Sequence, residues 1–159
     1  MSFSGELIFI HIAKAAGMAM EARVEANLIS GSGIAGDRYA NGTGYYSDKP
    51  DIREVTLIEH ETLEAIQRDF GIELLPGEHR RNLTTRNVPL NHLVGRQFRI
   101  GDVILEGGRL NTPCKYLETL LRKRVARSLI HRSGLNCRVI KSGTIRVGDV
   151  IEPVPGQNR

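Results

Sequence analysis

Cys114 lies in the segment of the chain whose residue types most clearly suggest chemistry, residues 111–118, with the sequence NTPCKYLE. Thr112 is of a type favoured at helix N-caps, and Pro113 is of a type favoured at the first helical position. This order predicts a helix with Cys114 in its first turn, where unpaired backbone N–H groups and the helix dipole favour thiolate over thiol. Lys115 would act in the same direction. We predict a nucleophilic or metal-binding sulfur, with a buried structural cysteine as the alternative.

The second cysteine, Cys137, lies in an apolar strand pattern and is expected to be a packing residue. Two cysteines are too few for a disulfide framework, and their positions match no Cys/His zinc spacing, so no zinc site is expected. The five histidines show neither i, i+4 pairing nor an HExxH motif. None of them is therefore assigned to a metal or to base catalysis.

Two further groups of residues are candidates for binding an anion. Gly36, Asp37 and Arg38 lie in a glycine-rich stretch, where they could orient a polar ligand or simply form a turn. Arg80, Arg81 and Asn82 open a predicted strand, so Arg80 and Asn82 should face one side and Arg81 the other. One face could present a guanidinium and an amide to a ligand, although a charged strand edge is equally consistent. The chain holds 17 Arg against 5 Lys, which is compatible with an oxyanion ligand but also with codon usage in a GC-rich genome.

The net charge is mildly basic, with 22 Lys and Arg against 18 Asp and Glu. Arg122, Lys123, Arg124 and Arg127 form a basic run, which we expect on the helix that begins near Cys114. Such a run is usually a solvated face, and it has no interleaved aromatic residues for stacking on bases. A non-catalytic protein that binds nucleic acid through this run is one alternative function.

The elements that must position these residues fit one domain, since the chain has 159 residues, of which 40% are hydrophobic. Helices are predicted at residues 59–70 and after Cys114, a functional loop at 30–47 and a turn at 142–148. Short strands are predicted at residues 6–12, 20–28, 54–58, 80–85, 96–100, 103–110, 137–141 and 149–153.

This pattern predicts a mainly β protein with helices (α+β), folded as a closed or strongly bent mixed β-barrel with two or more peripheral helices. We expect one domain over residues 1–154 and a flexible tail over 155–159. No secretory leader or apolar run of about 18 residues is recognisable. We therefore expect a cytoplasmic protein with reduced thiols.

Taken together, the order and spacing of these motifs from Leu7 to Pro153 resemble a MOSC domain, the family named after the C-terminal domain of molybdenum cofactor sulfurase. The residues that carry the resemblance are Gly36-Asp37-Arg38, Val55-Thr56-Leu57-Ile58, Arg81-Asn82, residues 93–101, Pro113-Cys114 and Arg146-Val147-Gly148-Asp149.

The resemblance implies a β-barrel-rich fold of the MOSC type and a reactive cysteine at the position of Cys114. Some members are proposed to carry sulfur on this cysteine as a persulfide. Others bind molybdenum cofactor, with the cysteine as metal ligand, and reduce N-hydroxylated compounds. The resemblance marks Cys114 as a catalytic candidate, and Lys115 is added as a second one because it lies beside that cysteine. It also places Tyr39 where the family often has His.

The candidates for a cofactor or anion site on the same resemblance are Gly36, Asp37, Arg38, Arg81 and Asn82, and Thr112, next to Pro113-Cys114, is a further candidate. The sulfurase's separate pyridoxal-phosphate domain does not fit within 159 residues, so no pyridoxal phosphate is expected in this chain. An iron-sulfur or flavin module is also missing. We therefore expect a small-molecule substrate and a partner protein, either a cysteine desulfurase or other sulfur donor, or an electron-transfer protein. Nucleic acid and membranes are not expected partners. A sulfur carrier and a molybdenum-dependent oxidoreductase both remain open.

Overall fold

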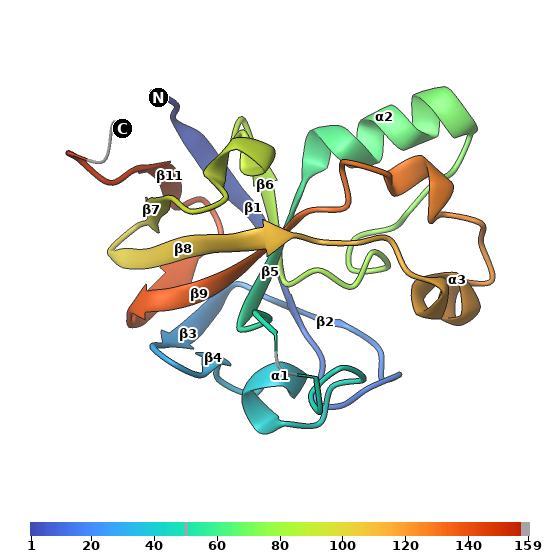
Figure 1. Cartoon of the computed structure of the whole chain (residues 1–159), viewed down its shortest axis with the longest axis horizontal. Helices are drawn as coiled ribbons and strands as arrows, with labels where there is room; N and C mark the ends of the chain where they lie inside the picture. Colours follow the sequence, from blue (N-terminus) through green and yellow to red (C-terminus); the bar gives the residue numbers. More distant parts are fainter. Residues whose placement is uncertain (50, 157–159) are drawn as a thin grey trace.

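A computed structural model describes residues 1–49 and 51–156 of the chain. Within these residues seven strands close a mixed β-barrel, because β11 pairs with β1 as well as with β7 (Figure 1). Among the barrel pairings only β5 with β6 is parallel. The predicted barrel is thereby confirmed. In their order round the barrel, the strands are β11 (Val150–Pro153), β7 (Gln97–Ile100), β8 (Val103–Leu110), β9 (Leu135–Lys141), β5 (Val55–Glu59), β6 (Leu83–Arg86) and β1 (Gly5–Ile12).

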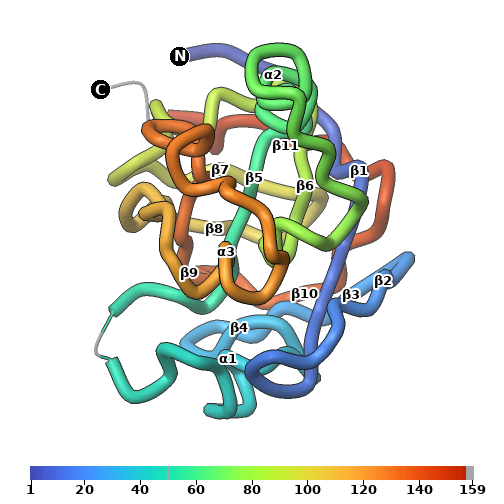
Figure 2. Tube along the Cα trace, turned by 90° about the vertical axis from the view of Figure 1, so that its right-hand side faces the viewer, coloured from blue at the N-terminus to red at the C-terminus, as the bar shows by residue number. Residues whose placement is uncertain are grey.

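A smaller sheet and several helices surround the barrel. The short strand β2 (Glu21–Arg23) pairs with β1, and a three-stranded sheet contains β10 (Gly143–Arg146), β3 (Glu25–Ile29) and β4 (Gly33–Ile34). The helices are α1 (Arg38–Asn41), α2 (His60–Phe70) and α3 (Lys115–Leu121), with 3-10 turns η1 (Leu90–Leu93) and η2 (Arg127–Leu129). Figure 2 shows α3 above α1 on one side of the molecule. None of the described helices is long and apolar enough to cross a membrane.

Three segments differ from the sequence-based expectations. The strand expected at 20–28 is divided at Val24, whose side chain is 79% exposed, so the apolar alternation there does not mark one buried face. The expected loop at 30–47 contains β4 and α1, and the expected turn at 142–148 contains β10. Strands β4 and β10 are short and are held by pairing with β3, which a local pattern does not reveal. Residues 157–159 of the expected tail lie outside the described residues.

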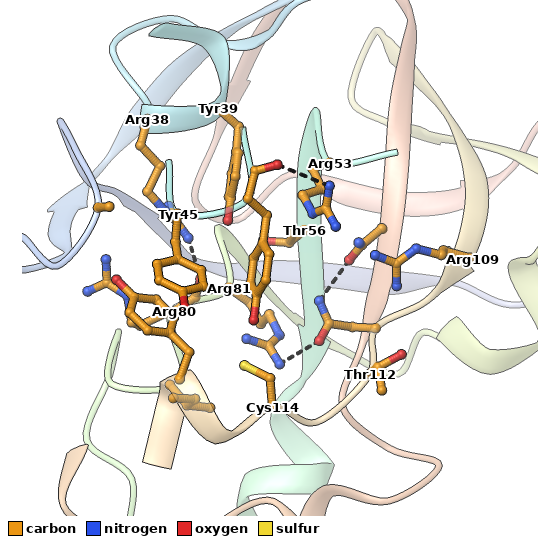
Figure 3. Close-up of a pocket in the computed structure, with 16 residues that line it drawn as sticks. Arg38, Tyr39, Tyr45, Arg53, Thr56, Arg80, Arg81, Arg109, Thr112 and Cys114 are labelled. Carbon is orange, nitrogen blue, oxygen red and sulfur yellow. Dashed lines mark hydrogen bonds between the residues drawn. The ribbon is translucent and has the colours of Figure 1, made fainter. Parts of the chain in front are cut away.

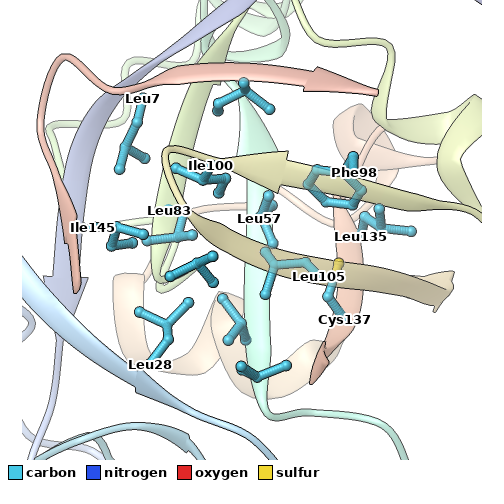
Figure 4. Packing of buried hydrophobic residues seen from close by; sticks show 14 of the residues in the cluster. Leu7, Leu28, Leu57, Leu83, Phe98, Ile100, Leu105, Leu135, Cys137 and Ile145 are labelled. Atoms are coloured by element: carbon cyan, nitrogen blue, oxygen red, sulfur yellow. The ribbon is translucent and has the colours of Figure 1, made fainter. Parts of the chain in front are cut away.

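The barrel core is formed by alternate residues of the strands, as the period of two requires. Val55 and Leu57 of β5, together with Leu135 and Cys137 of β9, belong to this core (Figure 4). Burial raises the pKa of the Cys137 thiol well above its usual range. Cys137 is therefore the packing residue that the sequence predicted.

A second apolar cluster joins the outer face of the barrel to the helices. Ile58 of β5 packs there with Ile66 of α2 and Leu117 of α3. Helix α2 has the predicted bounds within one residue and ends at Gly71, whose φ of 66° suits the left-handed conformation of a helix C-cap. The cluster holds α3 against the barrel wall, beside the residues that form the candidate site.

Candidate functional site

A cavity of about 300 Å³ lies between α1, α3 and the outer face of the barrel wall (Figure 3). Thr56 of β5 and Asn136 of β9 form its floor, because they alternate with residues that face the barrel core. Among the described residues that line it are five arginines and four tyrosines, and no aspartate or glutamate. The cavity therefore combines positive charge with aromatic surface.

Cys114 reaches this cavity from the start of α3, but in a different position from the predicted one. Helix α3 begins at Lys115, and Cys114 is its N-cap, with extended backbone angles of φ −132° and ψ 152°. The predicted N-cap at Thr112 and the predicted first-turn position of Cys114 are thus wrong. The extended conformation turns the half-buried sulfur into the cavity, whereas Lys115 is exposed and does not line it.

Two neighbouring side chains define the environment of the Cys114 sulfur. Tyr46 lines the same cavity as Cys114, and burial, followed by the interaction with Cys114, raises the pKa of Tyr46 to about 12. Figure 3 shows the sulfur directed at the guanidinium of Arg81. At neutral pH Tyr46 is thus a protonated hydroxyl that can donate to a thiolate, and Arg81 is a cation facing it.

Arg81 is buried, with 7% of its surface exposed, and it forms no ion pair with a described carboxylate. Burial lowers the pKa of Arg81 to about 10, while negative charge on Cys114 acts in the opposite direction. Arg81 therefore remains protonated at neutral pH. The guanidinium donates to neutral oxygen atoms: Ser133 O at 3.0 Å, Ser133 Oγ at 2.8 Å, His79 O at 2.8 Å and Asn111 Oδ1 at 2.7 Å.

Arg80 brings a second cation without a carboxylate partner into the cavity. The strand expected at 80–85 begins only at Leu83, and Arg80 has a φ of 63°, which breaks the extended pattern. Arg80 and Arg81 consequently line the same cavity, although strict alternation predicted opposite faces. The Arg80 Nη2 atom is buried and has no hydrogen-bond partner among the described residues. Arg80 Nη1 donates to the carbonyl of Met18 at 2.7 Å, so the guanidinium is held in place while part of its donor capacity stays unused.

Three other arginines of the cavity are paired with carboxylates. Arg38 Nη1 donates to Asp37 Oδ1 at 3.0 Å, and its Nη2 donates to the carbonyl of Arg80 at 3.0 Å. Arg53 and Arg109 both bridge to Asp51, at 3.4 and 2.7 Å, and Arg109 holds the pKa of that carboxyl below its usual range. The uncompensated charge of the cavity is therefore concentrated at Arg80 and Arg81.

All four tyrosines of the chain line this cavity. Tyr45 stacks on Tyr116 with ring centroids 3.8 Å apart and planes 13° apart. Tyr46 meets Tyr45 edge to face at 4.7 Å, and Tyr39 lies under the guanidinium of Arg38 at 4.8 Å. The rings give the cavity flat apolar walls on the side where the α1–β5 connection meets α3.

The structure brings together four of the residues predicted for the site: Arg38, Arg81, Thr112 and Cys114. The remaining candidates lie elsewhere.

Gly36 precedes α1, with a φ of 87°. Asp37 is fully buried and caps α1, accepting from Tyr39 N at 3.3 Å and from Ala13 N at 3.2 Å. Asn82 is also fully buried, and its amide joins Thr56 to β1.

Sequence reasoning missed the residues that the α1–β5 connection and β8 contribute: Tyr45, Tyr46, Arg53, Arg109 and Asn111. The adjacent pair Tyr45-Tyr46 in a glycine-rich stretch was the one available signal, because it holds half of the chain's tyrosines. Arg109 carries no local signal, and Asn111 opens the segment that holds Cys114 without having been a site candidate. Their place follows from the end of β8 lying beside the start of β9.

The sequence profile of the MOSC domain matches residues 47–152. The chain belongs to the MOSC domain family. The match includes Arg81 and Cys114, whereas Gly36, Asp37 and Arg38 lie before it. No curated protein sequence matches the chain significantly.

Solved structures of other proteins share this MOSC fold. The crystal structure of the YuaD protein from Bacillus subtilis matches with a TM-score of 0.81 and 18% identity, over 96% of each chain. YiiM from Geobacillus stearothermophilus matches with a TM-score of 0.73 and 12% identity, over 97% of this chain and 77% of YiiM. YiiM from Escherichia coli gives 0.66 and 19%, over 97% and 70%. The TM-scores establish a common fold, and at these sequence identities the likeness shows the fold alone.

Proposed function

We propose that this MOSC protein binds molybdenum cofactor in the cavity, with the Cys114 thiolate as a ligand to the metal, and that it reduces small N-hydroxylated compounds. One observation carries the proposal. Two buried or half-buried arginines, Arg80 and Arg81, face a cavity that offers them no carboxylate, and Arg80 Nη2 has no described partner. Buried charge of this kind is costly unless a ligand of opposite charge balances it.

The residues present fit a phosphorylated, pterin-type cofactor. Guanidinium groups form paired hydrogen bonds with phosphate oxygens, and Arg38, Arg80 and Arg81 place three of them around one cavity. The walls formed by Tyr45 and Tyr116 offer flat apolar surface suited to a planar heterocycle. The volume of about 300 Å³ is at the lower end of the range for small-molecule sites.

The side chains available as metal ligands also favour a metal that is carried by an organic cofactor. The described residues contain no group of three or more His, Cys, Asp or Glu side chains that could hold a bare metal ion. A metal bound here would therefore take Cys114 from the protein and its other ligands from the cofactor. A soft thiolate is a suitable ligand for such a centre.

The protein's own groups would prepare Cys114 for this role. Arg81 would oppose the negative charge of the thiolate, and the protonated Tyr46 hydroxyl in the same cavity would be a donor for it. The cofactor would supply the two-electron redox chemistry: one N–O bond is broken, two electrons and two protons are consumed, and an amine and water are released. The electrons would come from a separate protein.

A sulfur carrier is the second candidate, favoured by the half-buried position of Cys114. In that function the Cys114 thiolate would attack the sulfane sulfur of a desulfurase persulfide. The new S–S bond would form as the desulfurase thiolate leaves. Arg81 would then stabilise the resulting persulfide anion, because it is the buried cation that faces the sulfur.

Metal and pterin analysis separates the two functions. The protein is produced in a host that makes molybdenum cofactor, and molybdenum and released pterin are measured per chain. We expect stoichiometric metal and pterin in the wild type, loss of metal in Cys114→Ser and loss of both in Arg80→Gln. Arg146→Gln is the matched control, since Arg146 is an exposed residue of β10 that pairs with Glu25.

Folded wild-type protein that contains neither molybdenum nor pterin would refute cofactor binding. If that protein gains a reducible sulfur adduct on Cys114 after incubation with cysteine and a desulfurase, the sulfur-carrier function is supported in place of the cofactor-dependent reductase. Absence of the adduct would rule out the carrier as well.

A further inference from the structure

The charge of the chain is unevenly distributed around Cys114. Residues 109–132 contain seven Lys and Arg and one Glu, whereas the rest of the chain contains 15 basic and 17 acidic residues. The segment thus carries a formal charge of +6, while the remainder carries −2. The net charge of +4 therefore originates in the one segment that also holds the reactive sulfur.

Four cations of this segment have no ion pair with a described residue: Lys115, Arg122, Arg124 and Arg127, which we call the basic ledge. All four are exposed. The other cations are paired, Arg109 with Asp51, Lys123 with Glu78 and Arg132 with Asp69.

The backbone after α3 explains why the basic ledge stays uncompensated. The helix ends at Leu121, and Arg122 adopts a left-handed conformation with φ 54°. The basic run therefore lies in the following turn and in η2, and the prediction that it lies on the helix is wrong. The one acidic residue of the segment, Glu118, is engaged elsewhere, since its Oε2 accepts from the backbone N–H of Ala126 at 3.1 Å.

Two aliphatic side chains of the same segment are also exposed. Leu120 is 37% exposed and Ile130 is 52% exposed. The segment's aromatic residue, Tyr116, is stacked on Tyr45 at the cavity and does not offer a free ring to a base. Apolar contact surrounded by charge is typical of a protein interface, whereas single-stranded nucleic acid is usually bound on exposed aromatic rings.

We propose that the basic ledge docks an acidic electron-donor protein, whose carboxylates surround a small apolar patch that meets Leu120 and Ile130. The ledge begins at the residue next to Cys114, and α3 carries it about 10 Å further. This inference rests on the proposed function, because the reduction needs an external reductant. The donor loses two electrons for each N–O bond broken, and water supplies the two protons.

The test uses cofactor-loaded protein and a reduced acidic plant-type ferredoxin as the probe. Binding is measured at low and high salt, and oxidation of the ferredoxin is followed with an N-hydroxylated substrate. The test variant is the triple reversal Arg122→Glu/Arg124→Glu/Arg127→Glu. The control is Lys141→Glu/Arg146→Glu, which reverses exposed charge at the other end of β9 and on β10.

We expect the ledge variant to raise the dissociation constant at least about tenfold at low salt, with a smaller effect at high salt. The control should stay within about twofold of the wild type. Dithionite needs no docking surface, so turnover driven by dithionite should be equal in all three proteins.

Three results would overturn the proposal: no binding of the acidic probe to the wild type at low salt, equal binding by the ledge variant, or tighter binding of a short DNA duplex through the same residues. Loss of dithionite-driven turnover in the wild type would instead count against the proposed function. The two failures are therefore distinguishable.

Discussion

Replacing Asn82 with alanine should lower the free energy of unfolding of the barrel, although the sequence suggested Asn82 as a ligand-binding residue. Its amide is fully buried behind the cavity wall. Oδ1 accepts from the backbone N–H of Thr56 at 3.1 Å, and Nδ2 donates to the carbonyl of His11 at 3.1 Å. The amide thereby joins β5 to β1 across the start of β6. The Thr56 hydroxyl also donates to Oδ1 at 3.1 Å, and it keeps its bond from the backbone N–H of residue 82 when the amide is removed. The loss therefore leaves two backbone groups, one N–H and one C=O, buried without a partner.

The magnitude follows from these two groups. Each buried polar group left unsatisfied costs about 1–3 kcal/mol, so Asn82→Ala should lower the free energy of unfolding by about 4 kcal/mol. For a chain of this size, each kcal/mol shifts Tm by about 2–4 °C, which gives a decrease of about 8–16 °C. Thermal unfolding followed by circular dichroism measures it directly.

Thr112→Ala is the matched control. Thr112 was predicted for the same site as Asn82 and lines the cavity, but it is exposed, so its removal leaves no buried polar group without a partner. Its Tm should stay within about 2 °C of the wild type, since surface substitutions usually change stability by no more than about 0.5 kcal/mol. If Asn82→Ala melts like the control and loses bound cofactor instead, Asn82 contacts the ligand and the structural role argued here is wrong.

Three further predictions concern titratable groups. Tyr46→Phe should slow alkylation of Cys114 by iodoacetamide at pH 7 roughly tenfold, because the thiolate loses a charged hydrogen bond; equal rates in Tyr46→Phe and in the control Tyr45→Phe would contradict this. Burial raises the pKa of Glu59 to about 7, so its contribution to stability is complete below pH 4.5 and is lost as the pH rises through 7. Glu59→Gln should therefore raise Tm at pH 8 and leave it unchanged at pH 4, and an unchanged Tm at both would refute the assignment. Burial lowers the pKa of His79 to about 3, so its neutral ring favours the native state above pH 6.5, and this contribution should be lost as the pH falls from 6.5 toward 3. Denaturant unfolding across this range should show the loss in the wild type and a shallower one in His79→Gln.

The barrel could be predicted from the sequence because its signals are local. Apolar residues form short runs at 54–58 and 103–110 that are typical of strands, and Gly71 marks the end of α2. The errors arose where pairing across the molecule decides the structure. Strand β10 pairs with β3 from more than a hundred residues away, and its own composition suggests only a turn.

The candidate site was partly predictable for a similar reason. Cys114 stands out by its type and its neighbours, and Cys137 by its strand pattern. Arg80 and Arg81 were expected on opposite faces, and the positive φ of Arg80 directs both into one cavity. No residue pattern near position 80 announces that conformation, because the surrounding packing imposes it.

The sequence by itself determined that the chain forms a mainly β barrel, that one cysteine is a candidate for chemistry and that the other is core. These properties depend on residue type and on periods of two and 3.6, which are local. The tertiary structure decided what surrounds the sulfur. The cation that faces Cys114 is Arg81, which precedes β6, and the hydroxyl beside the sulfur in the same cavity is that of Tyr46 from the α1–β5 connection. They meet because barrel closure and the packing of α3 bring together segments that are far apart along the chain.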